Sequence, residues 1–323
     1  MKAAIHYQYG APEVVSIKET SMPSPKSNEV LVKIYASSVN RTDSGFRSAE
    51  YFISRFWSGL FKPKYKTLGC EYAGEIIALG ENVTRYKIGD RVFGYDDQKF
   101  GGHAAYKCVA EHDTIAIIPN HLSYLQAAAL SEGSHYALGN IQAAQVQAGQ
   151  HVLVYGATGA IGSAAVQLLK YYKAHVTAVC NTKNVPLLQS LLADEIIDYE
   201  TQDFTKTNTK FDFVFDAVGK SSFTQCKPLM KPQGIYISTE LGKNGSNIFL
   251  ALLTPIFSSK KVLFPIPSFT EEHIQLLKML AEQKYFTPVI DRVYPLDEIA
   301  EAYRYVETGQ KTGNVIIEIV TAL

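Results

Sequence analysis

The feature that most constrains the fold of this chain is a glycine-rich turn near its middle. The apolar run His151–Tyr155 is followed by Gly156, Gly159 and Gly162, and then by an apolar pattern of helical period over residues 161–172. A strand, a glycine turn and a helix in this order are typical of the first βαβ unit of a parallel sheet. We therefore predict a parallel sheet whose first strand begins at residue 151.

The same turn predicts a site for a dinucleotide. Glycine allows a sharp turn and a close approach of the backbone, and the first turn of a helix presents unpaired N–H groups to a phosphate. The spacing Gly-x-x-Gly-x-x-Gly differs from the better-known Gly-x-Gly-x-x-Gly, so a tight turn without a ligand is the alternative. The residues expected to contact the cofactor at this turn are Gly156, Thr158, Gly159, Ala160, Ile161 and Gly162.

The segment after the second expected strand indicates which dinucleotide is favoured. In NAD-binding proteins a carboxylate about twenty residues beyond the glycine turn accepts the hydroxyls of the adenosine ribose. Here that segment contains Asn181, Thr182 and Lys183 and no acidic residue. These residues offer donors and one cation to a 2′-phosphate, so we expect NADPH to be preferred, with NADH as the alternative. A lysine that simply starts an exposed helix is the other interpretation of Lys183.

Strand and helix patterns divide the 323 residues into two domains. Up to residue 122, short β-branched runs separated by turns predict a β-rich domain. From 123 to 269, apolar strands alternate with helices. A helix, a strand, a helix and a last strand over 314–319 follow, and we expect this last strand to pair with the first domain. The expected fold is α/β, with domains 1–122 plus 270–323 and 123–269.

The charge balance and the cysteines indicate which binding partners and which cellular location to expect. The 31 basic side chains balance the 31 acidic ones, which argues against nucleic acid or a membrane surface and leaves a small-molecule substrate as the expected partner. The four cysteines lie far apart, and Met1–Gly10 lacks a long apolar stretch, so we expect a cytoplasmic protein. The apolar run Ile248–Phe257 is too short to cross a membrane, and we expect a buried or lid segment there.

Besides the glycine turn, six short segments stand out, namely Met1–Ala3, Ser38–Asp43, Leu68–Gly74, Val83–Val92, Asp216–Gly219 and Thr312–Asn314. Together and in this order they resemble the medium-chain dehydrogenase/reductase superfamily, and within it the zinc-free branch of quinone oxidoreductases and enone reductases. The resemblance covers nearly the whole chain. It implies a GroES-like β-rich catalytic domain, a Rossmann domain with a doubly wound parallel sheet, and an active site in the cleft between the two domains.

The resemblance also assigns further residues to the cofactor. It implies that Tyr199 stands near the adenosine 2′-phosphate and that the residues bordering the nicotinamide half are Val218, Gly219, Ser238, Phe264 and Ile266. Related enzymes often dimerise through the edge of the Rossmann sheet. A homodimer through Lys260–Pro265 is therefore expected.

Zinc-dependent members of the superfamily hold their metal with two cysteines and a histidine, and the corresponding positions here resemble Asn40, Cys70 and Leu130. One thiol does not make a catalytic zinc site, so we expect no metal. Asp43 and His135, near Cys70 in the motif, keep a zinc-type alcohol dehydrogenase as an alternative. The lobe for a structural zinc is missing too, because residues 95–103 contain no cysteine.

Without a metal, hydrogen-bond donors must polarise the substrate carbonyl while a hydride adds at the β-carbon. The resemblance implies that Asn40 positions nicotinamide or substrate, that Tyr51 donates to the carbonyl oxygen and that Ser134 touches the nicotinamide. Asn40 as a turn cap and Tyr51 as a packed side chain are the alternatives. The aromatic segment 47–66 suits a wall for a planar substrate, or else a hydrophobic surface helix.

These observations predict an NADPH-dependent oxidoreductase that transfers a hydride to a quinone or an α,β-unsaturated carbonyl compound without a metal. A zinc-type alcohol dehydrogenase and a non-catalytic NADPH-binding protein of the same fold are the alternatives.

Overall fold

The computed structural model describes residues 1–50, 55–266 and 268–320. The chain forms two compact units, Met1–Glu132 with Phe269–Leu323, and Gly133–Ser268. The first unit extends beyond residue 122, where sequence patterns placed the boundary, because the backbone N–H groups of Ser131 and Glu132 are bonded to the Glu71 carboxylate of that unit.

The first unit is built on a seven-stranded sheet around one long strand, β3 (Glu29–Val39). The apolar side chains on one face of β3, such as Val30, Val32 and Ile34, are fully buried in the core of the unit. β15 (Asn314–Glu318) pairs antiparallel with β3 and confirms the expected return of the tail. The other strands of this sheet are β4 (Glu71–Leu79), β5 (Arg91–Tyr95), β6 (Tyr106–Ala110), β7 (Ile115–Ile117) and β14 (Ile290–Pro295).

Smaller elements complete the first unit. β1 (Lys2–Ile5) and β2 (Ser16–Glu19) form a separate antiparallel pair. The helices among the described residues are α1 (Arg41–Ser48), α2 (Arg55–Ser58), α3 (Tyr124–Ala127), α9 (Glu271–Glu282) and α10 (Ile299–Glu307). α10 packs its apolar face into a cluster with β15 and Val39 at the end of β3, so the C-terminal segment is part of this core.

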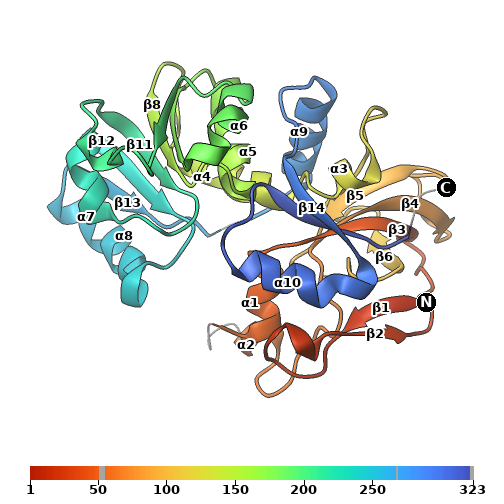
Figure 1. Ribbon diagram of the computed structural model, residues 1–323. Helices are drawn as coiled ribbons and strands as arrows, with labels where there is room; N and C mark the ends of the chain where they lie inside the picture. The colour runs from red at the N-terminus through yellow and green to blue at the C-terminus, as the bar shows by residue number, and fades with distance from the viewer. Residues whose placement is uncertain (51–54, 267, 321–323) are drawn as a thin grey trace. The chain divides into compact units, whose positions relative to one another are not determined.

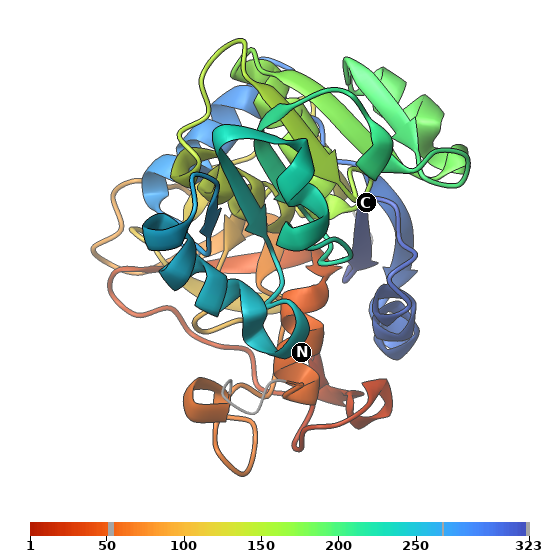
Figure 2. The same ribbon diagram turned by 90° about the vertical axis from the view of Figure 1, so that its left-hand side faces the viewer.

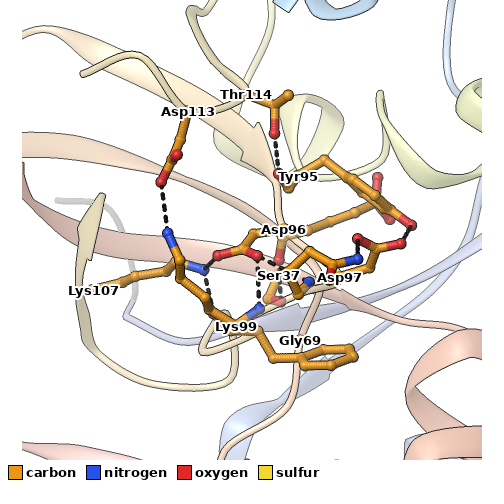
Figure 3. A network of polar contacts seen from close by, with 12 residues as sticks. Ser37, Gly69, Tyr95, Asp96, Asp97, Lys99, Lys107, Asp113 and Thr114 are labelled. Atoms are coloured by element: carbon orange, nitrogen blue, oxygen red, sulfur yellow. Dashed lines mark hydrogen bonds and ion pairs between the residues drawn. The ribbon is translucent and has the colours of Figure 1, made fainter. Parts of the chain in front are cut away.

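A polar network holds the loop after β5, where the resemblance implied a missing zinc lobe (Figure 3). The buried ammonium of Lys107 lies 2.9 Å from Asp96 Oδ2 and also donates to the carbonyl of Phe100. Asp96 Oδ1 accepts the backbone N–H of Lys99 at 2.8 Å, and the Lys99 side chain reaches Asp113. This segment is therefore fixed by an ion pair and backbone hydrogen bonds.

The second unit is a six-stranded parallel sheet in the order β10-β9-β8-β11-β12-β13 (Figure 1). In chain order its strands are β8 (His151–Tyr155), β9 (His175–Cys180), β10 (Glu195–Asp198), β11 (Phe211–Asp216), β12 (Met230–Ser238) and β13 (Lys261–Leu263). The chain thus runs outward from β8 to β10, crosses back to β11 and continues to β13. This is the doubly wound Rossmann order, whose ligands bind at the carboxyl ends of the strands near the crossing point.

Helices connect the strands of this sheet. α5 (Ala160–Tyr171) and α6 (Val185–Ser190) lie together on one side of it (Figure 1), as right-handed crossovers require for strands that run outward in sequence. α7 (Phe223–Cys226) and α8 (Ser246–Phe257) follow β11 and β12, and α4 (Glu132–Ala143) precedes the sheet.

Helix α8 corrects one expectation from the sequence. The run Ile248–Phe257 was expected to be buried or a lid, but most of its large side chains are exposed. The helix backbone runs beside β13 (Figure 2). Its inward side chains, Leu250 and Ala251, pack against the sheet core. The exposed ones are Ile248, Phe249, Leu252, Leu253, Ile256 and Phe257.

Candidate functional site

The glycine turn has the geometry that its sequence predicts. Gly156 directly follows β8 and has a φ of 73°, and a side chain added to it would collide with Val218. Gly162 lies in the first turn of α5, where an added Cβ would stand 2.1 Å from the carbonyl oxygen of Gly156. These two glycines therefore allow the helix to pack tightly against the end of its strand.

Gly159 has a different environment. It is the N-cap of α5 with extended backbone, and the nearest atom to an added Cβ, apart from its chain neighbours, is the Gly156 oxygen at 3.9 Å. No side chain caps this helix. The turn thus leaves open space in front of the helix N-terminus, which fits the phosphates of a dinucleotide. Ala160 and Ile161 are the first residues of the helix, and Thr158 accepts a hydrogen bond from the Asn184 amide at 3.4 Å.

The carboxyl ends of the central strands gather the expected nicotinamide-side residues. In the register of the sheet, Asp216 at the end of β11 lies opposite Tyr155 of β8 and Ser238 of β12. Val218 and Gly219 lie two and three residues after Asp216, and Gly219 has a φ of 65°. The structure therefore brings Gly156, Val218, Gly219 and Ser238 to one edge of the sheet.

Asp216 organises this edge, a role that its sequence motif alone did not predict. It is fully buried, and its carboxylate accepts the backbone N–H groups of Val218, Lys220 and Ser221 at 2.9 to 3.3 Å. It also accepts hydrogen bonds from the hydroxyls of Ser221 and Tyr236. An acidic residue at the end of an apolar strand is the signal that could have identified it.

The expected adenosine-side residues have unexpected neighbours. The backbone N–H of Thr182 donates to Glu200 Oε2 at 3.1 Å, and the Thr182 hydroxyl donates to Asp198 Oδ2 at 2.6 Å. The segment 180–183 contains no acidic residue, but the neighbouring strand β10 brings two carboxylates to it because Asp198 pairs with Cys180 in register. Within the described part of the chain Lys183 is exposed and forms no ion pair.

A buried polar atom and a surface hollow also lie near this edge of the sheet. Asn181 Oδ1 is buried and has no hydrogen-bond partner among the described residues, so it can accept a hydrogen bond from a ligand. Beyond β10 lies a hollow of about 460 Å³ that is lined by Tyr199, half exposed, together with Tyr155, Glu200, Thr201, Gln202, Asp203 and Phe204. An unsatisfied acceptor and a hollow beside the expected ribose position both fit a nucleotide.

Phe264 and Ile266 follow β13, at the far edge of the sheet from β10. Phe264 is partly buried, whereas Ile266 is 89% exposed. Ser134 lies near the start of α4 and is buried in the second unit. The proposed contacts of these three residues with a cofactor stay predictions.

In the first unit, Asn40 is engaged by its own neighbours. Its Oδ1 accepts the backbone N–H of Asp43 at 2.9 Å and so caps α1, and its Nδ2 donates to Cys70 Sγ at 3.0 Å and Ser38 Oγ at 3.3 Å. The side chain is buried. The capping role weighed from the sequence is therefore present, and it fixes the amide beside Cys70.

Three buried carboxyl groups surround this position. Glu71 Oε1 accepts the N–H groups of Ser131 and Glu132 at the start of α4, and its Oε2 accepts the Ser38 hydroxyl at 2.5 Å. Burial, with the nearby Glu132 carboxylate, raises the pKa of Glu71 to about 7. Burial also raises the pKa values of Asp43 and Glu132. The cluster thus holds protons more tightly than exposed carboxyl groups do.

The donor set beside Asn40 does not suit zinc. Cys70 supplies one thiol at this position, whereas a catalytic zinc site needs three protein ligands. Asn40 directs an N–H at that sulfur, and Leu130 supplies no donor atom. Within the described ranges, no group of three or more His, Cys, Asp or Glu side chains is arranged to hold a metal ion.

Two sequence predictions for the substrate side have different outcomes. Tyr51, the proposed donor to the carbonyl, lies outside the described residues. In the described part of the aromatic segment, Phe56, Trp57 and Phe61 are largely exposed. Both the substrate wall and the surface helix remain compatible with this exposure.

Comparisons with known proteins identify the family. Residues 26–120 match the pattern described as the alcohol dehydrogenase GroES-like domain, and residues 191–317 match that described as zinc-binding dehydrogenase. The chain is similar to a 2-methylene-furan-3-one reductase of Solanum lycopersicum, with 30% identity over 98% of this chain and 79% of the relative. The chain is a medium-chain dehydrogenase/reductase.

Other relatives of this medium-chain dehydrogenase/reductase are also named as reductases of quinones or of unsaturated carbonyl compounds. It is 29% identical to a quinone oxidoreductase of Homo sapiens over 98% of this chain and 97% of the relative, and 27% identical to an NADPH-dependent alkenal/one oxidoreductase of Arabidopsis thaliana over 98% and 79%. The solved quinone oxidoreductase of Coxiella burnetii superposes with a TM-score of 0.86 at 29% identity over 99% of both chains. The resemblance and the fold class stated from the sequence are thereby confirmed.

No helix among the described residues combines the length and the apolar character that a membrane span requires.

Proposed function

We propose that this medium-chain dehydrogenase/reductase reduces a quinone or an α,β-unsaturated carbonyl compound with NADPH, with NADH as the alternative donor, and that it needs no metal. The observation that carries the proposal is the glycine turn, which leaves the space in front of α5 open at the carboxyl edge of a Rossmann sheet. Relatives named quinone oxidoreductase and alkenal/one oxidoreductase, similar over nearly the whole chain, support the substrate class.

The residues of the chain would have separate roles in cofactor binding and in catalysis. The glycine turn with Asn181, Thr182, Lys183 and Tyr199 would hold the adenosine half, and Val218, Gly219, Ser238, Phe264 and Ile266 would border the nicotinamide half. When bound, the dihydronicotinamide supplies a hydride. Asn40 and Ser134 would position the reacting groups, and Tyr51 would donate a hydrogen bond to the carbonyl oxygen, whose negative charge grows as the hydride adds to the β-carbon. A proton from solvent or a hydroxyl would then convert the resulting enolate into the saturated product.

A metal-free reaction is supported by the chemistry of the residues at the zinc position. Purified protein dialysed against EDTA and 1,10-phenanthroline should oxidise NADPH with quinones, alkenals and enones at the rate of the untreated protein, because Asn40, Cys70 and Leu130 supply only one potential ligand. The rate is followed by the loss of NADPH absorbance.

Two other outcomes of this assay would overturn the proposal. Loss of activity on chelation, with recovery on adding Zn²⁺, would make the chain a zinc-type alcohol dehydrogenase. Binding of NADPH without its oxidation by any compound of the panel would make it a non-catalytic member of the family.

A homodimer through the second unit is part of the proposal. β13 is the last strand on its side of the sheet, and the neighbouring helix α8 exposes six large apolar side chains. Single apolar residues are common on monomer surfaces, but a contiguous apolar face marks an interaction site. A partner strand beside β13 would pair its free edge and cover this face.

We expect the native protein to have twice its chain mass of 35.7 kDa by light scattering at micromolar concentration. Replacing Leu252 and Ile256 by Glu should give monomers, since two carboxylates would be desolvated at the interface. An Ile88→Glu variant, which alters an exposed side chain of the first unit, is the control and should stay dimeric. A monomeric native protein would contradict this part of the proposal.

A cytoplasmic location is supported by the cysteines. All four are free thiols, and Cys70, Cys180 and Cys226 are buried. Free thiols are typical of reducing compartments.

A further inference from the structure

Two carboxylates, those of Asp198 and Glu200, lie at the expected 2′-phosphate position, and the proposed function gives them no role. The oxygen Glu200 Oε2 accepts the Thr182 backbone N–H at 3.1 Å, and Asp198 Oδ2 accepts the Thr182 hydroxyl at 2.6 Å. Both hydrogen-bond donors of Thr182 are thus engaged by negative charges. The remaining cation of this loop, Lys183, is exposed.

The two carboxylates differ in how firmly they are held. Asp198 is the last residue of β10, and its Oδ1 also accepts the backbone N–H of Glu200 at 3.0 Å, so it is fixed at the strand end. Glu200 follows β10 on an exposed turn, and its side chain lines the hollow beside Tyr199. Glu200 is therefore the less firmly held of the two charges and the one that lines the hollow.

A carboxylate at this place affects the two nicotinamide cofactors differently. A ribose 2′-hydroxyl can donate a hydrogen bond to a carboxylate, which is the arrangement of NAD-binding Rossmann domains. A 2′-phosphate carries close to two negative charges, accepts hydrogen bonds only and is repelled by a carboxylate. It would also have to displace Glu200 from the Thr182 N–H.

We propose that Glu200 is the specificity-determining residue for the cofactor, and that its charge lowers the preference for NADPH so that the protein also uses NADH. The inference rests on the proposed function, because it concerns the same cofactor site. Lys183 and Glu200 then act in opposite directions, and the balance of the two sets the preference.

Substitutions at Glu200 test this directly. Glu200→Gln keeps an oxygen that can accept the Thr182 N–H and removes the charge, so the fold should be unchanged. We expect the ratio of kcat/KM for NADPH to that for NADH to increase by about tenfold or more, through a lower KM for NADPH. Glu200→Lys should increase the ratio further, and Lys183→Gln should decrease it.

The matched control is Asp203→Asn. Asp203 lines the same hollow as Glu200, but its carboxylate accepts hydrogen bonds from Thr205 and does not contact Thr182. Neutralising it changes the local net charge by the same amount as Glu200→Gln. The cofactor ratio of this variant should stay close to that of the native protein.

A binding measurement separates the inference from the proposed enzyme activity. Calorimetric titration with adenosine 2′,5′-bisphosphate and with adenosine 5′-monophosphate compares ligands with and without the 2′-phosphate. Glu200→Gln should tighten binding of the bisphosphate by about tenfold. It should change binding of the monophosphate much less, because an amide oxygen can also accept a hydrogen bond from the 2′-hydroxyl.

The outcomes are distinguishable. If both ligands bind and Glu200→Gln changes neither the affinity ratio nor the cofactor ratio, Glu200 has no role in specificity and the inference is wrong, while the proposed function stands. If Glu200→Gln and Asp203→Asn shift the ratios equally, the effect is one of general charge and the inference is also wrong. If neither these ligands nor a nicotinamide cofactor binds to any of the proteins, the proposed cofactor site itself fails and the inference fails with it.

Discussion

Gly159→Val is expected to weaken binding of NADPH and NADH by about a hundredfold and to leave the protein folded. The backbone of Gly159 is extended, which suits a β-branched residue, and apart from its chain neighbours no residue lies closer than 3.9 Å to the added Cβ. The valine side chain would instead fill the open space where the phosphates are proposed to lie. Fluorescence titration with each cofactor measures the affinity, and thermal unfolding measures the stability, which should fall by no more than about 1 kcal/mol for the poorer helix cap.

Gly162→Ala is the matched comparison on the same turn. Its methyl group would stand 2.1 Å from the Gly156 oxygen and 2.7 Å from the Cα of Ala157, and both are backbone atoms that cannot rotate away. We expect it to destabilise the fold by about 2 kcal/mol. An undiminished cofactor affinity in Gly159→Val would show that the open face of the turn is not a phosphate site.

Glu71→Ala is expected to destabilise the protein by about 3 kcal/mol. The carboxylate of Glu71 is the acceptor for two buried backbone N–H groups at the start of α4 and for the Ser38 hydroxyl, and alanine would leave them without it. Glu71→Gln should retain most of this stability, because an amide oxygen can accept both N–H groups while its nitrogen donates to Ser38. Chemical denaturation of the two variants measures the difference. Equal stability of Glu71→Ala and the native protein would contradict this account.

The Glu71→Gln variant also isolates the pH dependence that the buried carboxyl group contributes. The pKa of Glu71 is raised from 4.5 to about 7 in the folded protein, so the folded state binds this proton more tightly than the unfolded chain does. Its contribution to stability is complete below pH 4.5 and is lost as the pH rises toward 7. As the pH rises from about 5 to about 8, the native protein should lose this contribution and Glu71→Gln should not. The free energy of unfolding of Glu71→Gln, compared with that of the native protein, should therefore increase by up to about 3 kcal/mol over this range. Glu75→Gln, on the same strand but partly exposed, is the control for replacing a carboxylate.

The features that the sequence predicted correctly depend on local patterns. The strand, glycine turn and helix from His151 to Tyr171 follow from an apolar run, three glycines and a helical period. The pairing of β15 with β3 was expected because the last apolar strand had no place in the parallel pattern. The first signal lies within one segment of the chain, and the second lies in the order of strands and helices along the chain.

The features that the sequence did not reveal depend on contacts between distant residues. Glu200 reaches Thr182 because β10 pairs with β9 in a register that no local pattern fixes. The hydrogen bonds of Asp216 to the loop after it depend on that loop folding back over the strand end. The apolar run of α8 was expected to be a buried or lid segment, and most of its large side chains are exposed instead of buried, because composition does not show which neighbour covers an apolar face.

Isotope transfer shows whether the protein delivers a hydride to a conjugated carbon without a metal. The native, chelator-treated protein is given NADPH that carries deuterium at C4 of the nicotinamide together with an α,β-unsaturated ketone, and the product is analysed by NMR. We expect deuterium at the β-carbon of a saturated ketone, in both treated and untreated protein. Deuterium on the carbonyl carbon of an unsaturated alcohol, formed only when Zn²⁺ is present, would contradict this expectation.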